Sequence, residues 1–183
     1  MAESDLDLLL EEDELDDEDT LENKYLIFSL GEREYGIEIK YITEIIGMQP
    51  ITEVPDMPQF IKGVTNLRGK VVPLIDVRLR FRMESIPYSD RTCVIILNFE
   101  GEHLGLIVDT VREVVTISVN QTEPAPKIGD GEGNRFISCF GKVGDSVKIL
   151  LDVRRLLHDE ELEILHKTIP ANESPIVNQG GRI

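Results

Sequence analysis

An arginine at the tip of a tight turn is the residue of this sequence whose setting most clearly suggests a chemical role. Arg68 lies in the stretch GVTNLRGKVVPLIDVR, residues 63–78. The runs 64–67 and 70–75 are rich in strand-forming residues, and Gly69 between them supplies the positive φ that a two-residue hairpin turn requires. An arginine at such a tip offers its five N–H donors outward. The stretch therefore predicts a hairpin that presents a guanidinium to a partner.

Residues that could perform catalysis form no recognisable set. His103 lies in an expected strand, while His158 and His166 lie on the exposed side or at the end of an expected final helix. Their spacing is not that of metal ligands, and no nucleophile or acid–base partner accompanies them. The segment GDGEGN, residues 129–134, is not followed by a helix, so it predicts a flexible loop and no phosphate site. We therefore expect a binding module, with no enzymatic activity, cofactor or metal.

The net charge of −16 is concentrated at the start of the chain. Residues 1–23 contain 12 acidic and no basic residues, whereas the remainder contains 23 acidic and 19 basic residues. Such a block is expected to be a disordered tail that repels nucleic acid and anionic membranes. Its leucines leave two roles open, an amphipathic docking segment or a solubilising tail; they are Leu6, Leu8, Leu9, Leu10 and Leu15.

The cellular setting follows from what the sequence lacks. No apolar segment resembles a secretion signal or a membrane span, so we expect a cytoplasmic protein with no direct membrane insertion. Cys93 and Cys139 stand inside apolar runs, which predicts buried thiols and no disulfide.

The chain contains an internal duplication. Residues 25–46 align without a gap on residues 94–115 at an offset of 69, and residues 60–78 resemble residues 136–154 at an offset of 76. Each unit is expected to hold two strands, a helical turn, a second hairpin and an Asp-Val-Arg helical cap. The many short strands with Gly and Pro turns predict a mainly β fold of small barrels or a sandwich.

Two helical predictions accompany this repeat. The spacing of Ile42, Ile45 and Ile46 predicts a short helical turn in the first unit. The second cap is expected to extend into a C-terminal helix whose apolar face contains Val153, Leu156, Leu157, Ile164 and Leu165.

The two units differ at the hairpin tip. Arg68-Gly69 falls on Gly144-Asp145, so the second unit keeps the turn and lacks the arginine. Arg68 is therefore either a specialisation for recognition or an ordinary surface arginine.

The sequence resembles the CheW family, adaptors that couple chemoreceptors to the histidine kinase CheA in bacterial chemotaxis. The resemblance is carried by FIKGVTNLRGKVVPLIDVR with the upstream EYGIEIKYITEII and the downstream LGLIVDTVREVV, and it extends from about residue 23 to residue 165. It implies two small SH3-like five-stranded β-barrels with exchanged segments. Barrel one would combine 24–46 with 116–165, barrel two would span 47–115, the domain would end near 168, and 169–183 would be a flexible tail.

The resemblance also implies partners and a binding site. The partners would be the cytoplasmic tip of a methyl-accepting chemoreceptor and the regulatory domain of CheA, in receptor arrays beneath the inner membrane. The receptor-binding positions carried over are Ile42, Glu44, Gly63, Asn66, Arg68 and Gly69. Glu44 is expected to pair with Arg68, and Gly63 to allow a partner backbone to approach. The residues that bind the kinase are not identified.

Three other functions stay open at this point. A CheW-like adaptor could serve a non-flagellar chemosensory pathway that controls surface motility or gene regulation. A nucleic-acid-binding barrel would require a basic stripe. An enzyme acting on a small ligand would require a deep pocket with converging titratable groups.

Overall fold

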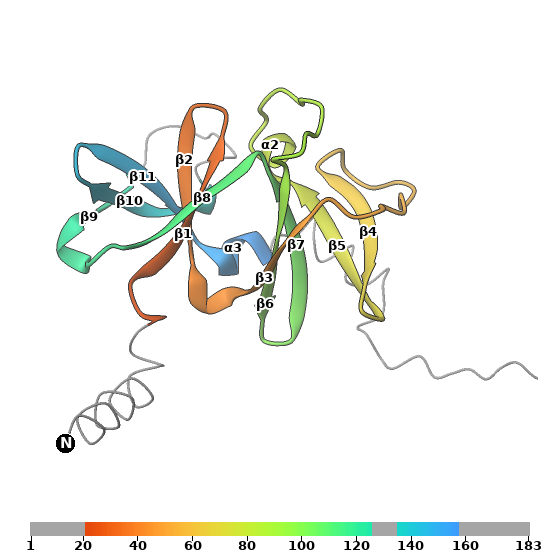
Figure 1. Ribbon diagram of the computed structural model, residues 1–183, viewed down its shortest axis with the longest axis horizontal. Coiled ribbons are helices and arrows are strands. Elements are labelled where there is room, and N and C mark those ends of the chain that lie inside the picture. Colours follow the sequence, from red (N-terminus) through yellow and green to blue (C-terminus); the bar gives the residue numbers. More distant parts are fainter. Residues whose placement is uncertain (1–20, 126–134, 158–183) are drawn as a thin grey trace, which may run out of the picture.

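The computed structural model describes residues 21–125 and 135–157, and most of its elements are β-strands (Figure 1). The strands are β1 (Lys24–Leu30), β2 (Arg33–Glu38), β3 (Ile42–Gly47), β4 (Ile61–Leu67), β5 (Lys70–Asp76), β6 (Cys93–Phe99), β7 (Glu102–Val108), β8 (Thr110–Thr116), β9 (Thr122–Pro124), β10 (Ile137–Val143) and β11 (Ser146–Leu151). The short helices are η2 (Ile39–Tyr41), α2 (Val77–Arg80), η3 (Val119–Gln121) and α3 (Val153–Leu157). The prediction of a mainly β fold is confirmed. Most of the acidic tail, the continuation of the last helix and the C-terminal tail lie outside the described residues.

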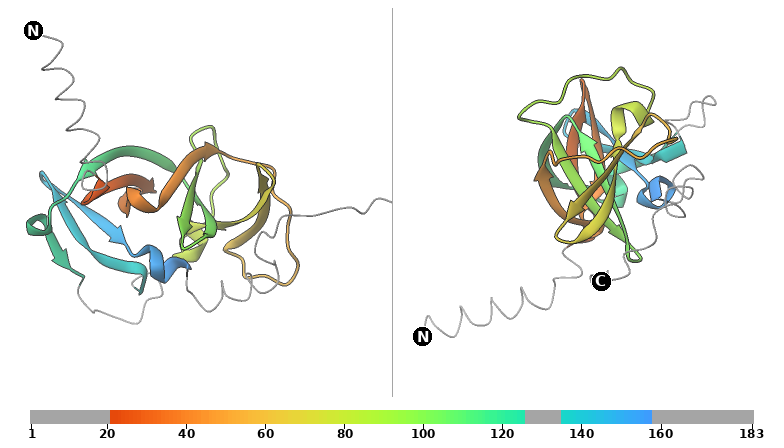
Figure 2. Two further views of the ribbon diagram at one scale, coloured as in Figure 1. Left: turned by 90° about the horizontal axis from the view of Figure 1, so that it is seen from below. Right: turned by 90° about the vertical axis from the view of Figure 1, so that its right-hand side faces the viewer.

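The strands form two sheets, which lie side by side as two lobes in Figure 2. Barrel one is built on the six-stranded sheet β8-β1-β2-β11-β10-β9, and barrel two on the five-stranded sheet β3-β6-β7-β5-β4. The three-residue strand β9 is the sixth strand of barrel one and was not expected, because its sequence, TEP, shows no strand pattern.

The strand orders confirm the exchange of segments between repeats. The duplication relates β1 to β5 with β6, β7, β8, β10 and β11 in turn. Each sheet therefore combines the first hairpin of one repeat with the third strand and second hairpin of the other. The two five-strand orders are identical once the repeats are superposed.

The predicted barrel boundaries are wrong, because each of them places one strand in the wrong barrel. Strand β3, expected in barrel one, pairs with β6 in barrel two, and β8, expected in barrel two, pairs with β1 in barrel one. The prediction of a helical turn over residues 42–46 is also wrong, because these residues form strand β3. Ile45 is an exposed residue on the outer face of a strand, so the three isoleucines imitate helical spacing without lying on one face.

Two close parallel contacts join the repeats. Strand β11 runs parallel to β2 with Leu150 opposite Gly36, and β5 runs parallel to β7 with Leu74 opposite Gly105. A Cβ atom on Gly36 would lie 2.7 Å from a methyl carbon of Leu150, and one on Gly105 would lie 2.4 Å from a methyl carbon of Leu74. Side chains cannot approach so closely, which explains why the duplication keeps glycine and leucine at both crossings.

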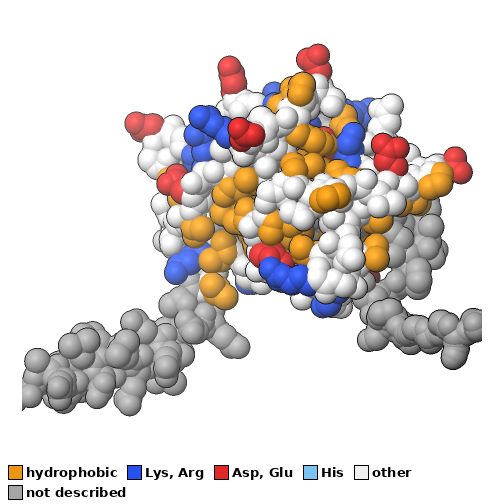
Figure 3. Space-filling model, turned by 45° about the vertical axis from the view of Figure 1, so that its right-hand side comes forward, with side chains coloured by type: hydrophobic (Ala, Val, Ile, Leu, Met, Phe, Trp, Pro, Cys, Tyr) orange, Lys and Arg blue, Asp and Glu red, His pale blue; other side chains and the backbone are white. Residues whose placement is uncertain are grey.

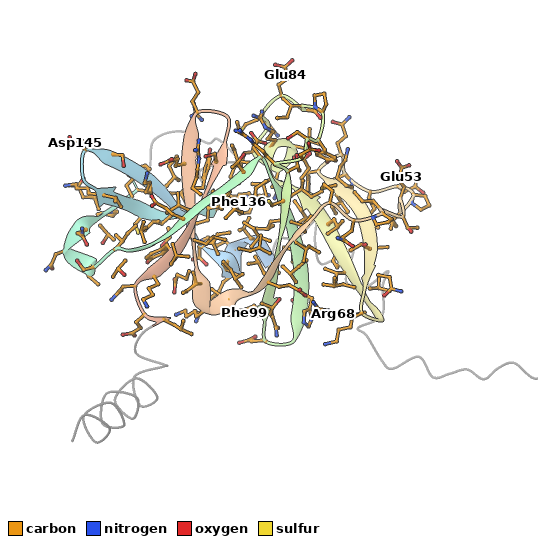
Figure 4. All side chains as sticks on the ribbon, in the orientation of Figure 1. Glu53, Arg68, Glu84, Phe99, Phe136 and Asp145 are labelled. Atoms are coloured by element: carbon orange, nitrogen blue, oxygen red, sulfur yellow. The ribbon has the colours of Figure 1, made fainter. Side chains whose placement is uncertain are left out.

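The buried side chains form a large group between the barrels and a smaller one within barrel two. The larger group joins residues of β1 and β2 with residues of β6, β7, α2 and α3. Figure 4 places Phe136 in the middle of the molecule, between the two barrels. The smaller group contains Val72, Leu74, Val94, Ile96 and Ile107. Cys93 and Cys139 are only half-buried, because Cys93 begins a strand and Cys139 lies beside the short strand β9.

An ion pair ties the two barrels together where the chain passes from β7 to β8. Arg78 donates from Nε to Asp109 Oδ1 at 2.7 Å and from Nη2 to Oδ2 at 2.6 Å, and the Gly31 amide donates to Oδ2 at 2.8 Å. Both side chains are mostly buried. Burial alone would raise the pKa of Asp109, but the hydrogen bonds from Arg78 and Gly31, with the charge of Arg78, hold this pKa below its ordinary value.

We expect Asp109→Asn to lower the free energy of unfolding by about 1.5–3 kcal/mol at pH 7, because charged hydrogen bonds to Arg78 are lost. A carboxyl whose pKa is lowered in the folded state stabilises the fold above its unfolded pKa of about 3.9, and this contribution disappears as the pH falls through the folded pKa. Urea denaturation at pH 7 and near pH 3 measures both effects. The difference between the parent and the variant should shrink at the lower pH. The control is Asp90→Asn in an exposed loop, and a difference that does not change with pH would contradict the assignment.

Candidate functional site

The residues expected to bind a partner lie along one line on barrel two. Strands β3 and β4 are the two edges of its sheet, and the segment that follows β3 returns to β4. Thr52 and Val64 exchange backbone hydrogen bonds of 2.8 and 2.9 Å, and Thr65 donates its hydroxyl to the Pro50 carbonyl at 2.9 Å. We call this line of contact, between residues 44–52 and strand β4, the seam. It closes the barrel.

Arg68 and Glu44 span the seam through a bidentate ion pair. Arg68 Nη1 donates to Glu44 Oε1 at 3.0 Å, and Nη2 donates to Oε2 at 2.7 Å. The predicted pairing is therefore confirmed. The Arg68 side chain is 77% exposed, whereas that of Glu44 is 22% exposed. Glu44 thus holds one edge of the guanidinium, and the remaining N–H groups make no hydrogen bond to the described part of the chain.

The turn that carries Arg68 is built by two other candidate residues. The Gly69 amide donates to the side-chain oxygen of Asn66 at 2.8 Å, and Arg68 and Gly69 have φ values of 54° and 86°. Asn66 and Gly69 therefore shape the tip. In Figure 4 Arg68 lies at the end of the β4–β5 hairpin.

Comparison with the second repeat separates the arginine from the turn. Gly144, the counterpart of Arg68, has a φ of 60°, so the same left-handed conformation is filled there by glycine. A residue with a Cβ atom adopts this conformation at a cost of about 1–2 kcal/mol. Asp145 lies at the outer end of barrel one, far from Arg68 (Figure 4). The first repeat therefore holds an arginine where glycine would fit with less strain.

Gly63 has an internal role that differs from the one expected. Its φ is 140°, and a Cβ atom there would lie 2.1 Å from the Thr52 carbonyl oxygen. The sequence-based hypothesis was that a partner's backbone approaches Gly63. The backbone that approaches is that of Thr52, across the seam.

Apolar side chains accompany the charged tip. Ile42 is half-buried against the core between the barrels, while Ile45 on the same strand is 43% exposed. The repeat equivalent of Ile45 is Val114 on β8, which is 53% exposed. Figure 3 shows that hydrophobic side chains gather over the centre of the face seen when barrel two is turned forward, with charged groups around them.

Sequence reasoning missed Ile45 and Val114 as surface residues. Ile45 was expected in the helical turn of the first unit, and Val114 is its equivalent in the second unit. The signal that could have revealed them is that two apolar residues fall on each other at an offset of 69 in segments that alternate as strands.

Two further searches concern metal binding and membrane spans, and both cover only the described residues. Residues 21–125 and 135–157 contain no group of three or more His, Cys, Asp and Glu side chains that could hold a metal ion. Within the same ranges, no helix has the length and hydropathy needed to span a membrane.

We expect Gly63→Ala to destabilise the protein by at least about 2 kcal/mol, because the new methyl group must displace the Thr52 backbone. Gly69→Ala is the matched control, since Gly69 also has positive φ but no atom lies within 4 Å of the added Cβ. Thermal and urea unfolding of the two variants separate the contact from the backbone strain. Equal losses in both variants would show that contact with Thr52 is not the limiting factor.

Comparisons with known proteins agree with this arrangement. The family model for the CheW-like domain matches residues 24–161. The chemotaxis protein CheW of Klebsiella aerogenes is 39% identical over 147 residues, covering 80% of this chain and 89% of that protein. The chemotaxis protein CheW of Bacillus subtilis is 35% identical over 137 residues, covering 75% of this chain and 88% of that protein. The crystal structure of scaffolding protein TtCheW from Thermoanaerobacter tengcongensis superposes with a TM-score of 0.70 at 34% identity, covering 76% of this chain and 94% of that one. The chain therefore belongs to the CheW family of chemotaxis scaffold proteins.

Proposed function

We propose that this chain is a non-catalytic adaptor that couples a chemoreceptor to the histidine kinase CheA in the cytoplasm, within receptor arrays beneath the inner membrane. Arg68 would bind the cytoplasmic tip of the receptor. The observation that supports this role is an exposed arginine held in a left-handed turn where the second repeat has glycine. Local structure does not require the arginine, so a partner is the best reason for it.

The ion pair with Glu44 prepares Arg68 for binding. Ordering a long side chain at an interface costs about 0.5–1.5 kcal/mol. Glu44 already fixes the Arg68 guanidinium through two hydrogen bonds, so this ordering precedes association. The guanidinium edge that faces away from Glu44 keeps donors for the partner.

The apolar residues beside the tip supply the contact area that a helical partner needs. A receptor tip made of a helical hairpin would lay an apolar stripe on Ile45, which is exposed on the outer face of β3 next to Glu44, while Ile42 would support this strand from the core side. Arginines that become buried on binding are among the residues that most often dominate such interfaces. Gly63, Asn66 and Gly69 would act indirectly, by shaping the seam and the tip.

The second proposed partner is the regulatory domain of CheA, and its contact residues are not assigned. An adaptor in a non-flagellar pathway remains the alternative, and no specific observation favours it. Affinity capture from native cells, followed by identification of the receptor and kinase retained, distinguishes the two pathways.

We expect Arg68→Ala to change the free energy of unfolding by no more than about 1 kcal/mol, because an exposed ion pair contributes little to stability. Arg68→Gly should be as stable as the parent or more stable, since glycine relieves the left-handed turn. Both should weaken binding of a receptor cytoplasmic fragment by about 30-fold or more, which corresponds to about 2 kcal/mol for an arginine that becomes buried on binding. Calorimetric titration and thermal unfolding measure the two quantities.

Lys70→Ala is the control for general charge, because Lys70 is an exposed cation at the same tip. It should retain most of the affinity. Retention of full affinity by Arg68→Gly would remove Arg68 from the interface, and so would a severe loss of stability with unchanged affinity in Arg68→Ala.

We also expect Glu44→Gln to weaken receptor binding less than Arg68→Ala does, by about 3- to 10-fold, because it loosens the guanidinium without removing it. A double-mutant cycle with Arg68→Ala should show that the two changes are not additive in affinity. Additive effects would mean that Glu44 contacts the receptor independently of Arg68.

A further inference from the structure

A buried arginine lies between the two barrels, away from the seam. Arg80 ends α2 and is only 3% exposed. Its guanidinium carbon lies 4.3 Å from the ring centroid of Phe60 and 4.5 Å from that of Phe136. A flat cation in contact with two aromatic rings is attracted by both, most strongly where water is excluded.

The two rings are equivalent residues of the two repeats. Phe60 precedes β4 of barrel two, and Phe136 precedes β10 of barrel one. The Phe60 carbonyl accepts a hydrogen bond of 2.8 Å from the Asp76 amide, and the Phe136 carbonyl accepts one of 2.8 Å from the Asp152 amide. Arg80 therefore contacts the same structural position in each barrel.

The local fold does not require an arginine at this position. Leu156 is the counterpart of Arg80 in the second repeat, and it is 2% exposed. A leucine therefore fills the equivalent buried position in α3. The arginine breaks the symmetry of the repeats at the point where the barrels meet.

Neighbouring rings extend the contact into barrel one. Phe81, next to Arg80, packs on Phe136 at a centroid distance of 6.0 Å and on Tyr35 of β2 at 5.4 Å. Tyr35 stacks in turn on Phe28 of β1 at 5.8 Å. The end of α2, which follows a strand of barrel two, is therefore held against the first hairpin of barrel one.

We propose that Arg80 is a positioning residue that fixes the orientation of barrel one relative to barrel two. The hydrophobic effect has no preferred direction, whereas a planar cation keeps its attraction to two rings only while both rings face it. Surfaces on the two barrels are thereby presented as one rigid unit. The inference holds whatever partner binds the seam.

Residual dipolar couplings of the ¹⁵N-labelled full-length protein test this role, because they report the orientation of each barrel separately. In the parent, amides of β1, β2, β10 and β11 and amides of β4 to β7 should fit one alignment tensor. In Arg80→Met and Arg80→Lys, the couplings measured in each barrel should still fit a single alignment tensor. The tensors fitted to the two barrels should, however, differ in magnitude. Hydrogen exchange at the Asp76 and Asp152 amides should become at least tenfold faster. Arg91→Met, which changes an exposed arginine in the loop before β6, should leave both measurements unchanged.

A single tensor that still fits both barrels in Arg80→Met and Arg80→Lys would overturn the proposal, as would a parent that already needs two. A loss of melting temperature without a change in relative orientation would show that Arg80 only adds stability. Failure of both variants to fold would also overturn it, since Arg80 would then be required within the barrels and not between them.

Discussion

The close parallel contact between the repeats is the constraint on which the rest of the structure depends. Gly36 against Leu150 and Gly105 against Leu74 let a strand of one repeat lie directly beside a strand of the other. These contacts pass the first hairpin of each repeat into the sheet of its counterpart. Each exchanged hairpin also packs apolar side chains into the space between the two sheets. These side chains form the large core between the barrels. The Arg78–Asp109 pair and the rings around Arg80 lie at the same junction and hold it.

The candidate site is built on the closing line of barrel two, so architecture and recognition share residues. Gly63 admits the Thr52 backbone, and Asn66 with Gly69 forms the turn. Substitutions at these three positions are expected to change the shape of the seam and of the hairpin tip. Arg68 differs from them, since the second repeat makes its turn with glycine. This division explains how one short stretch can combine residues needed for folding with one residue available to a partner.

Much of this arrangement could be predicted from the sequence, because the duplication repeats the physical requirements of the fold. The duplication and the two hairpins followed from residue type and spacing, and the pairing of Arg68 with Glu44 was expected from the family resemblance. The barrel boundaries implied by the resemblance placed β3 and β8 in the wrong barrels. Separately, β3 was expected to be a helical turn, since an exposed isoleucine on its outer face imitates helical periodicity. The internal partner of Gly63 could not be anticipated either. Sequence shows that a backbone must come close, but it does not show which one.

The strand order also determines when each barrel can form during synthesis. The strands of barrel two span residues 42–108 without interruption, so all of them are available once the chain has emerged through β7. The hairpin β1–β2 emerges first, yet its neighbours in the sheet are β8 and β11, which lie more than a hundred residues away in the case of β11. Pairings of such long sequence separation form slowly. The sheet that contains the β1–β2 hairpin is therefore completed only after β11 has been synthesised, and until then the edge of β2 that pairs with β11 has no partner strand.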